Sequence, residues 1–401
     1  MPAWSMALAT PRDESSTVVG VELSGAELAD ELVAIGRGHG LAAVGVTSAE
    51  VFTETLNDLL DRRRQGLHGG MQFTYRNPER STDPARIIPG ARSLVVGAWG
   101  YRREDHQVAG GTSASRPRAR VARYAQRDHY ASLRTALSAV AERLKSEGWR
   151  ATVVCDDNAL VDRAAAHRAG LGWFGKNSLL LLPGLGSWFV LGSVVTDAPL
   201  SSDRGLDPTP PPTALHGHGG GCGSCARCMT ACPTGALVSP GVVDARRCLA
   251  WLVQAPGSFP EQYREALGDR IYGCDECQSV CPINRLADRR DPPLPVEPDS
   301  DSDNDSDSEA GVDLLDLLES SDADLLDRHG RWYIAHRDPR YLRRNALVAL
   351  GNTGDGNDPD TEAALGRALA DPDPMITEHA AWAARKLGRD DLADRVGVAS
   401  A

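Results

Sequence analysis

Hydrophobic and polar residues follow two different periods along the first half of the chain. Apolar residues three and four apart predict helices over residues 24–40, 128–148 and 161–169. Short apolar runs predict buried strands near Leu41–Val46, Ser93–Trp99, Arg150–Val154 and Ser187–Thr196. Helices and strands that take turns over about 180 residues indicate an α/β domain, which we place at residues 20–206.

The C-terminal part of the chain has only the helical period. Two alanine- and leucine-rich segments, Asp338–Gly351 and Asp373–Gly388, each begin with Asp-Pro and end with Leu-Gly. A spacing of about 35 residues favours a HEAT-like α-helical repeat over residues 314–397, in which stacked helix pairs bury a shared core. Two unrelated alanine-rich helices are the alternative.

An acidic tract lies before these helices. Residues 297–309 read EPDSDSDNDSDSE, with seven acidic residues and no basic one. Because such a segment repels itself and has nothing to pack, we predict an acidic disordered linker over residues 291–313 rather than an interaction tail. The tract carries seven of the twelve units of net negative charge, so the remainder of the chain, at −5, does not exclude a nucleic-acid partner.

Composition bounds the location of the protein. The chain of 401 residues is 41% hydrophobic, but it has no run of 18 apolar residues that could span a membrane. Its first residues, MPAWSMALATPRDESS, lack the apolar stretch of a secretory signal. We therefore expect a cytoplasmic protein whose thiols stay reduced. A monomer is the default oligomeric state.

Eight of the nine cysteines follow a pattern typical of paired iron–sulfur clusters. One run, C-x-x-C-x-x-C-x-x-x-C-P, starts at Cys222, and a second, C-x-x-C-x-x-x-C-P, starts at Cys274. In the second run Ile271 stands where a first cysteine is expected, and Cys248 is the obvious substitute. The predicted ligands of the two 4Fe–4S clusters are Cys222, Cys225, Cys228 and Cys281 for one, and Cys232, Cys248, Cys274 and Cys277 for the other.

Other uses of these cysteines fit the spacing less well. Zinc sites prefer paired knuckles separated by a spacer, whereas disulfides need an oxidising compartment. We expect residues 207–290 to form a ferredoxin-like α+β module with two 4Fe–4S clusters.

The segments around these cysteines resemble those of epoxyqueuosine reductases. The resemblance runs from about Gly70 to Gly351 and rests on the blocks VDARRC, GDRIYGCD-x-C, AGLGW-x-GK-x-S and RRNALVALGN. It implies a cobalamin-binding α/β domain and reduction of epoxyqueuosine to queuosine at the wobble position of tRNA. The implied cofactors are two 4Fe–4S clusters and cobalamin, and the implied partners are tRNA and an external low-potential electron donor. A corrinoid reductive dehalogenase and a ferredoxin-type electron carrier are the alternatives.

The resemblance also implies site residues. Asp156, at the end of a predicted strand, matches the general acid of the family, since a partly desolvated carboxylic acid can protonate an opening epoxide. The adjacent Asp157 is the other candidate, and either residue could instead cap a helix. Cys155 is a lone cysteine on an apolar strand and receives no role. Cofactor contacts are implied for Arg80, Tyr124, Asp156 and Asp275.

A basic segment with aromatic residues is the candidate tRNA contact. Six arginines and one acidic residue lie between Arg328 and Arg344, interleaved with Trp332, Tyr333 and Tyr341. Guanidinium groups bind phosphates and aromatic rings stack on unpaired bases. Because the resemblance requires tRNA, we predict tRNA contacts by Arg340, Arg343 and Arg344. The alternative is a helix whose arginines pair with nearby acids.

Overall fold

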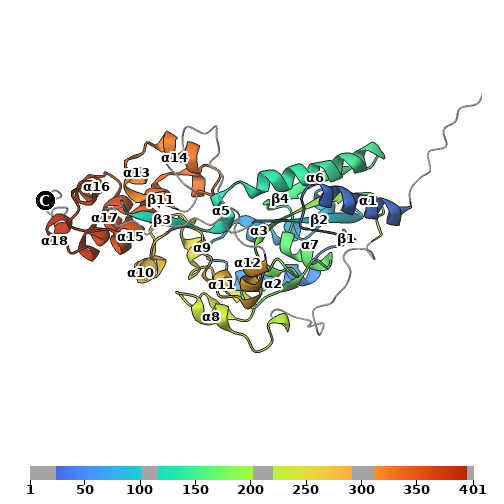
Figure 1. The fold of residues 1–401 in the computed structure, drawn as a ribbon, viewed down its shortest axis with the longest axis horizontal. Helices are drawn as coiled ribbons and strands as arrows, with labels where there is room; N and C mark the ends of the chain where they lie inside the picture. Colours follow the sequence, from blue (N-terminus) through green and yellow to red (C-terminus); the bar gives the residue numbers. More distant parts are fainter. Residues whose placement is uncertain (1–23, 102–115, 202–219, 291–310, 395–401) are drawn as a thin grey trace, which may run out of the picture.

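The computed structural model describes residues 24–101, 116–201, 220–290 and 311–394. A sheet with its helices lies at one end and the C-terminal helices lie at the other, with a module of short helices below and between them (Figure 1). Among these residues no helix is long and apolar enough to cross a membrane. The acidic tract at residues 297–309 lies outside the described residues.

The N-terminal part confirms the helices and strands that the hydrophobic period predicts. Its elements in chain order are α1 (Gly25–Gly38), β1 (Ala43–Ser48), α2 (Thr53–Arg64), α3 (Phe73–Arg76), α4 (Pro78–Ser81), η1 (Pro84–Arg86), β2 (Ser93–Gly100), β3 (Arg118–Val121), α5 (Arg123–Gln126), α6 (His129–Ser146), β4 (Ala151–Cys155), α7 (Asp162–Arg168), β5 (Trp173–Phe174), β6 (Leu180–Leu181) and β7 (Phe189–Thr196). Local chemistry sets the start of α1, where Ser24 and Glu27 form a reciprocal capping box.

The main sheet has the order β1-β2-β7-β4, and every neighbouring pair is antiparallel. Alternate residues point to opposite faces, so Val95 packs with α1 and α6 while Leu94 and Val96 pack with α2 and α7. Helices thus cover both faces, as expected. The domain is mixed α and β, but its sheet is antiparallel throughout, whereas α/β domains usually have a mostly parallel sheet. Direction depends on the path of the chain between strands, which the hydrophobic period does not record.

The cysteine module consists of short elements joined by long loops. They are η2 (Gly220–Cys222), α8 (Arg227–Ala231), β8 (Leu237–Ser239), β9 (Val242–Val243), α9 (Leu249–Leu252), η3 (Glu261–Tyr263), α10 (Arg264–Leu267), β10 (Arg270–Tyr272), α11 (Glu276–Ser279) and α12 (Pro282–Arg290). Strands β8 and β9 form an antiparallel hairpin, and α8 packs against α11. The module is therefore mixed α and β.

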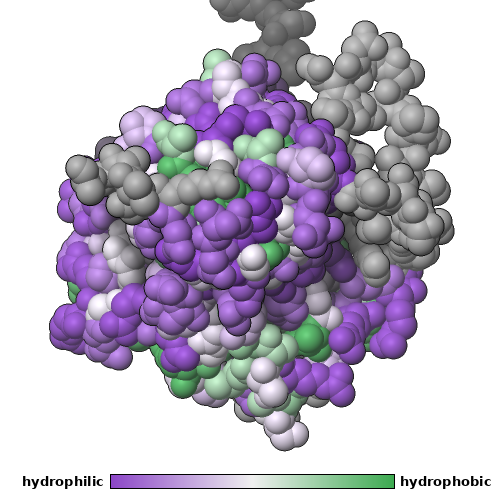
Figure 2. Space-filling view, turned by 90° about the vertical axis from the view of Figure 1, so that its left-hand side faces the viewer, coloured by the Kyte–Doolittle hydropathy of each residue, from purple (hydrophilic) through white to green (hydrophobic). Residues whose placement is uncertain are grey.

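The C-terminal part is almost wholly helical, and both predicted helices are confirmed there as α15 and α17. Its elements are β11 (Val312–Asp313), α13 (Leu314–Glu319), α14 (Asp322–His329), η4 (Ala335–Arg337), α15 (Arg340–Thr353), α16 (Pro359–Leu369), α17 (Pro374–Lys386) and α18 (Asp390–Ala393). Helices α15 and α17 approach closely at Gly351, where a Cβ would lie 2.7 Å from the Trp382 ring. The outer face of this end is largely hydrophilic (Figure 2).

A small second sheet joins all three parts. Strand β3 pairs with β10 of the cysteine module in parallel and with β11 of the C-terminal part in antiparallel fashion. One core cluster accordingly contains Ala119, Ile271, Val312 and Leu347. The end of the predicted linker is therefore wrong, since residues 312–313 form a strand. The error arises because the partner strand lies nearly 200 residues earlier in the chain.

Candidate active site

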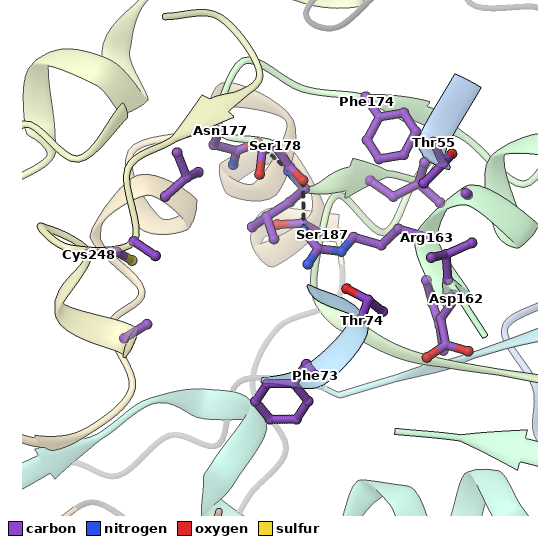
Figure 3. A pocket seen from close by; sticks show the side chains of 18 of the residues that line it. Thr55, Phe73, Thr74, Asp162, Arg163, Phe174, Asn177, Ser178, Ser187 and Cys248 are labelled. Atoms are coloured by element: carbon purple, nitrogen blue, oxygen red, sulfur yellow. Dashed lines mark hydrogen bonds between the residues drawn. The ribbon is translucent and has the colours of Figure 1, made fainter. Parts of the chain in front are cut away.

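A cavity of about 1420 Å³ lies where the sheet domain meets the cysteine module (Figure 3). Helices α2, α3 and α7, the loop after β4, the β5–β6 hairpin and two cysteine segments form its wall. The volume exceeds the roughly 300–1,000 Å³ of ordinary ligand pockets. The space therefore suits a large cofactor together with part of a substrate.

The loop that carries Asp156 follows directly from the packing of β4. Cys155, the last residue of this strand, is buried opposite Gly192, where an added Cβ would lie 2.6 Å from the Cys155 Cβ. Burial raises the pKa of the Cys155 thiol to about 11. The chain then turns sharply, and Asp156 adopts a left-handed backbone with φ 51°. Aspartate is one of the few residues that tolerate this conformation, which recurs at functional sites.

Asp156 and Asp157 have different surroundings. The Asp157 Oδ1 accepts a hydrogen bond from the Ala159 N–H at 2.8 Å, which closes a local turn. Asp156 lines the cavity and remains exposed to solvent there. Partial desolvation raises the pKa of its carboxyl, Arg134 opposes this effect, and the negative charge of Asp157 adds to it. Helix α7 starts later, and its N-cap residue Val161 forms no side-chain cap, so neither aspartate caps this helix.

Tyr124 and Asp275 both line the cavity. The Asp275 carboxylate accepts hydrogen bonds from the Arg123 backbone N–H at 2.8 Å and from the Gln278 side chain at 3.0 Å. Burial nevertheless raises the pKa of Asp275. Gly273 has to be small here, because a Cβ would lie 2.4 Å from the Ala122 Cβ and 3.1 Å from the Tyr124 ring. The structure thus brings both predicted cofactor contacts to the wall.

Arg80 lies elsewhere, so the structure does not bring this predicted cofactor contact to the cavity wall. It lies on α4, exposed to solvent, and is not among the residues that line the cavity. Its neighbour Ser81 points inward and donates to the Asn158 carbonyl at 2.5 Å. Helix α4 therefore supports the loop of Asp156 through Ser81. Successive side chains on a helix point about 100° apart, and the sequence around Arg80 does not show which of them faces the cavity.

The cysteines fall into the two predicted groups. Besides burial, Cys222, Cys225 and Cys281 each raise the pKa of Cys228, so these four thiols lie near one another. In the same way Cys248 and Cys274 raise the pKa of Cys277, and Cys232 raises that of Cys248. Within the described residues, no three His, Cys, Asp or Glu side chains converge tightly enough to hold a single metal ion.

The two groups differ in position. Cys232, Cys248, Cys274 and Cys277 all line the cavity, whereas the other four cysteines do not. The groups are adjacent, since Cys228 also raises the pKa of Cys277. Cys232 has a further feature: its Sγ accepts the Ala236 N–H at 3.2 Å, and backbone N–H groups lower the pKa of this thiol against the effect of burial. The inner group is thus placed to exchange electrons with a molecule in the cavity.

Three buried polar atoms on the cavity wall have no hydrogen-bond partner within the described residues. They are the His68 Nδ1, the Trp173 Nε1 and the Asp162 Oδ1. A buried polar group without a partner costs on the order of 1–3 kcal/mol, so such atoms are normally satisfied by a ligand or water. Cobalamin carries many amide groups around a broad apolar ring. Its size and chemistry therefore fit this wall.

Sequence reasoning missed several residues of the cavity. Tyr130 lies on α6, and Asp162 and Arg163 begin α7. Desolvation is the first cause that raises the pKa of Tyr130 and of Asp162. The only signal for these residues in the sequence was the pair of adjacent charged residues, Asp162 and Arg163, at the start of a helix.

The three arginines predicted to contact tRNA have acidic or carbonyl partners. Arg340 is half exposed and pairs with Asp338 at 2.6 Å and with Asp373. Arg343 pairs with Asp322 at 2.6 Å.

For Arg344 the prediction is wrong. Its side chain is 0% exposed, and it donates to the carbonyls of Leu252 at 3.1 Å and Ala255 at 2.7 Å. Arg344 therefore joins α15 to the cysteine module instead of facing solvent. Its place on an amphipathic helix could be read from the sequence, but the module that covers this face could not.

Two adjacent groups of four cysteines, one of which lines a large cavity together with a carboxylic acid, define an iron–sulfur oxidoreductase. Family models agree: residues 221–284 match a 4Fe-4S double cluster binding domain, and residues 81–157 match the model described as epoxyqueuosine reductase QueG, DUF1730. The epoxyqueuosine reductase of Xanthomonas campestris pv. campestris is 34% identical over 88% of this chain and 94% of its own length. That of Bacillus subtilis is 31% identical over 92% and 90%. This chain belongs to the epoxyqueuosine reductase family.

Solved structures agree with this assignment. A crystal structure of an epoxyqueuosine reductase with an epoxyqueuosine-modified tRNA-Tyr stem loop matches with a TM-score of 0.75, at 30% identity over 90% of each chain. A structure of the Bacillus subtilis enzyme, at 29% identity over 92% of this chain and 93% of its own, also has a TM-score of 0.75. It is described with its catalytic aspartate loop swung out of the active site. Membership of this family excludes both the dehalogenase and the electron-carrier alternatives.

Proposed function

We propose that this protein reduces epoxyqueuosine to queuosine in tRNA, with electrons passing through two 4Fe–4S clusters and with Asp156 as proton donor. The observation that carries the proposal is that the inner cysteine group and the Asp156 carboxyl line the same cavity. Reductive loss of an epoxide oxygen needs electrons and protons at one place, and these groups supply both.

The cysteine groups give the electrons a direction. Cys222, Cys225, Cys228 and Cys281 lie outside the cavity wall and hold the outer cluster in this proposal. Cys232, Cys248, Cys274 and Cys277 hold the inner cluster at the wall. An external low-potential carrier therefore meets the outer group, and thiolate ligation keeps both potentials low.

The cavity holds cobalamin in this proposal. A bound cobalamin supplies the metal-centred reduction of the epoxide C–O bonds, while the protein binds, orients and protonates. Tyr124 and Asp275 lie beside the inner cysteines, and the Nδ1 of His68 and the Nε1 of Trp173 offer partners for polar groups of the ring's side chains. The apolar wall excludes water from the reacting epoxide.

Asp156 delivers a proton to the epoxide oxygen. As the C–O bond opens, negative charge develops on this oxygen, and a neutral carboxylic acid can donate to it. Desolvation in the cavity raises the pKa of Asp156, which favours the protonated form that a general acid needs. Asp157 is the weaker candidate because its Oδ1 is held by the Ala159 N–H.

The C-terminal helices take the tRNA side in this proposal, as a HEAT-like repeat. Phe73 on the cavity wall contacts Tyr333, with ring centroids 5.1 Å apart, and Tyr333 is 41% exposed. An exposed aromatic ring at the edge of the cavity can stack on an unpaired anticodon-loop base. Arg340 and Arg343 lie on the neighbouring α15 and can exchange their carboxylate partners for phosphates. One tRNA needs one active site, so we propose that a monomer acts.

The test is direct conversion of the modified base. Protein loaded with iron, sulfide and cobalamin is mixed anaerobically with a low-potential reductant and tRNA that carries epoxyqueuosine. Nucleoside mass spectrometry should show the loss of one oxygen atom from the modified base, and omission of cobalamin should abolish this loss. Absence of conversion by protein that contains both clusters and the corrin would refute the proposal.

A further inference from the structure

Asp162 is a half-buried acid with a fully buried Oδ1 atom, and neither the fold nor the proposed reaction accounts for it. It is the first residue of α7, and its side chain lies on the cavity wall (Figure 3). An aspartate at a helix start usually accepts a backbone N–H. Here the buried Asp162 Oδ1 has no hydrogen-bond partner within the described residues, and the N-cap residue Val161 forms no side-chain cap. Helix capping therefore does not explain Asp162.

The charged groups around Asp162 do not neutralise it with an ion pair. The adjacent Arg163 turns away and donates from Nη1 to the Ser178 carbonyl at 2.8 Å (Figure 3). Asp156 and Asp157, in the preceding loop, add negative charge. Burial first, and then the charge of Asp156, raise the pKa of Asp162 well above its ordinary value, with Arg163 as the opposing influence. Burial of the Oδ1 atom without a hydrogen-bond partner, together with this direction of the pKa shift, favours the neutral, protonated form of Asp162.

The phenol of Tyr130 completes this group of titratable side chains. It lines the same cavity from α6, close enough for Asp156 and Asp162 to influence it. Burial is the main cause that raises the pKa of Tyr130 far above 10, so this hydroxyl also stays neutral and can relay a proton without losing one permanently.

The proposed reaction consumes two protons, whereas a single carboxylic acid supplies only one. An epoxide plus two electrons and two protons gives an alkene and one water: both C–O bonds break, the C=C bond forms and the oxygen leaves with two hydrogens. The electrons come from the external reductant. After the first transfer Asp156 is a carboxylate and cannot donate again until it regains a proton.

We propose that Asp162 holds the second proton and passes it to the Asp156 carboxylate, so that Asp156 donates twice in one turnover. This inference rests on the proposed function. Asp162 regains its proton from water after the product leaves. Because it acts through Asp156, it is a positioning and relay residue, not the group that touches the epoxide.

The first test does not depend on turnover. Infrared spectra of wild-type and Asp162→Asn protein, both loaded with clusters and cobalamin, are recorded at pH 7 in H₂O and D₂O. The difference spectrum should contain the C=O band of a protonated carboxylic acid, which shifts in D₂O and is absent in the variant. Absence of this band from the difference spectrum means that Asp162 is ionised and overturns the proposal.

The second test separates a proton relay from a structural role. Asp162→Asn should lower the single-turnover rate about 100-fold, the lower range for loss of an acid–base group, without changing tRNA binding. A small acid such as formic acid should restore part of this rate, and Asp162→Glu should retain most of it.

The outcomes are distinct. An unchanged rate, or a lower rate that formic acid does not restore, overturns the relay. Failure of the wild-type protein to convert the tRNA counts instead against the proposed function, and the infrared result still decides the protonation of Asp162.

Discussion

Substitution of Asp156 by Asn tests the chemistry of the cavity most directly. The change removes the ionisable proton and keeps the size of the side chain. Asparagine tolerates the left-handed backbone that Asp156 adopts with φ 51°, so the loop after β4 should keep its shape. Both groups of cysteines and the cavity wall are left in place.

The expected loss of rate follows from the role of a general acid. Positioned proton transfer contributes about 100- to 10,000-fold, which corresponds to about 3–5 kcal/mol of transition-state stabilisation. Because Asp156 is the only aspartate of the loop whose side chain is not held in a local turn, we expect the upper half of this range for Asp156→Asn.

The pH dependence gives an independent check. A general acid acts in its protonated form, so kcat/KM of the wild type should fall as pH rises through the pKa of Asp156. Burial raises this pKa above the ordinary value of 3.8, so the fall lies at higher pH than for an exposed aspartic acid. The same shift has a stability consequence: the neutral carboxyl stabilises the fold below pH 3.8, and this stabilisation is lost as pH rises through the folded-state pKa. Asp156→Asn should therefore not destabilise the protein at pH 7.

The assay is single-turnover conversion of epoxyqueuosine tRNA, followed by nucleoside mass spectrometry. Asp157→Asn is the matched control, because the amide oxygen can still accept the Ala159 N–H. This control should retain a rate within several-fold of wild type. If Asp156→Asn retains its rate while Asp157→Asn loses it, the roles of the two aspartates are reversed and the argument from the local turn is wrong.

Three further substitutions test the fold and the clusters. Cys248→Ser should reduce bound iron from about eight to about four atoms per chain in anaerobic iron assays, whereas Cys155→Ser should leave it unchanged. Arg344→Met should lower the free energy of unfolding, measured in urea, by about 3 kcal/mol or more, because several buried carbonyls lose their hydrogen-bond donor. A small effect on stability together with weaker tRNA binding would instead show that Arg344 contacts tRNA. Gly273→Ala should lower the midpoint of thermal unfolding more than Gly257→Ala, since both glycines have positive φ but only Gly273 has close neighbours; equal effects would exclude the steric cause.

The cysteine spacing contained most of the candidate site. Three thiols within seven residues have to meet because the intervening loops are short, and the assignment of Cys248 to the second group needed only a count of missing ligands. The periodic helices and strands were equally accessible, since each depends on neighbours a few positions away. Asp156 was accessible through its place at the end of a strand within a block that resembles a known family.

Contacts between distant segments were beyond the sequence. Strand β3 pairs with strands about 150 and 190 residues later, and no local pattern records such partners. The same limit explains Arg344. Its position on an amphipathic helix is compatible with phosphate binding, but in the fold the cysteine module covers this face of the helix. It also explains Asp162, an ordinary acid at a helix start whose Oδ1 atom is buried without a partner only because distant segments form the cavity wall around it. The sequence determined which chemical groups this protein has, whereas burial in the tertiary structure decided which of them can react, because desolvation depends on every segment that surrounds a group.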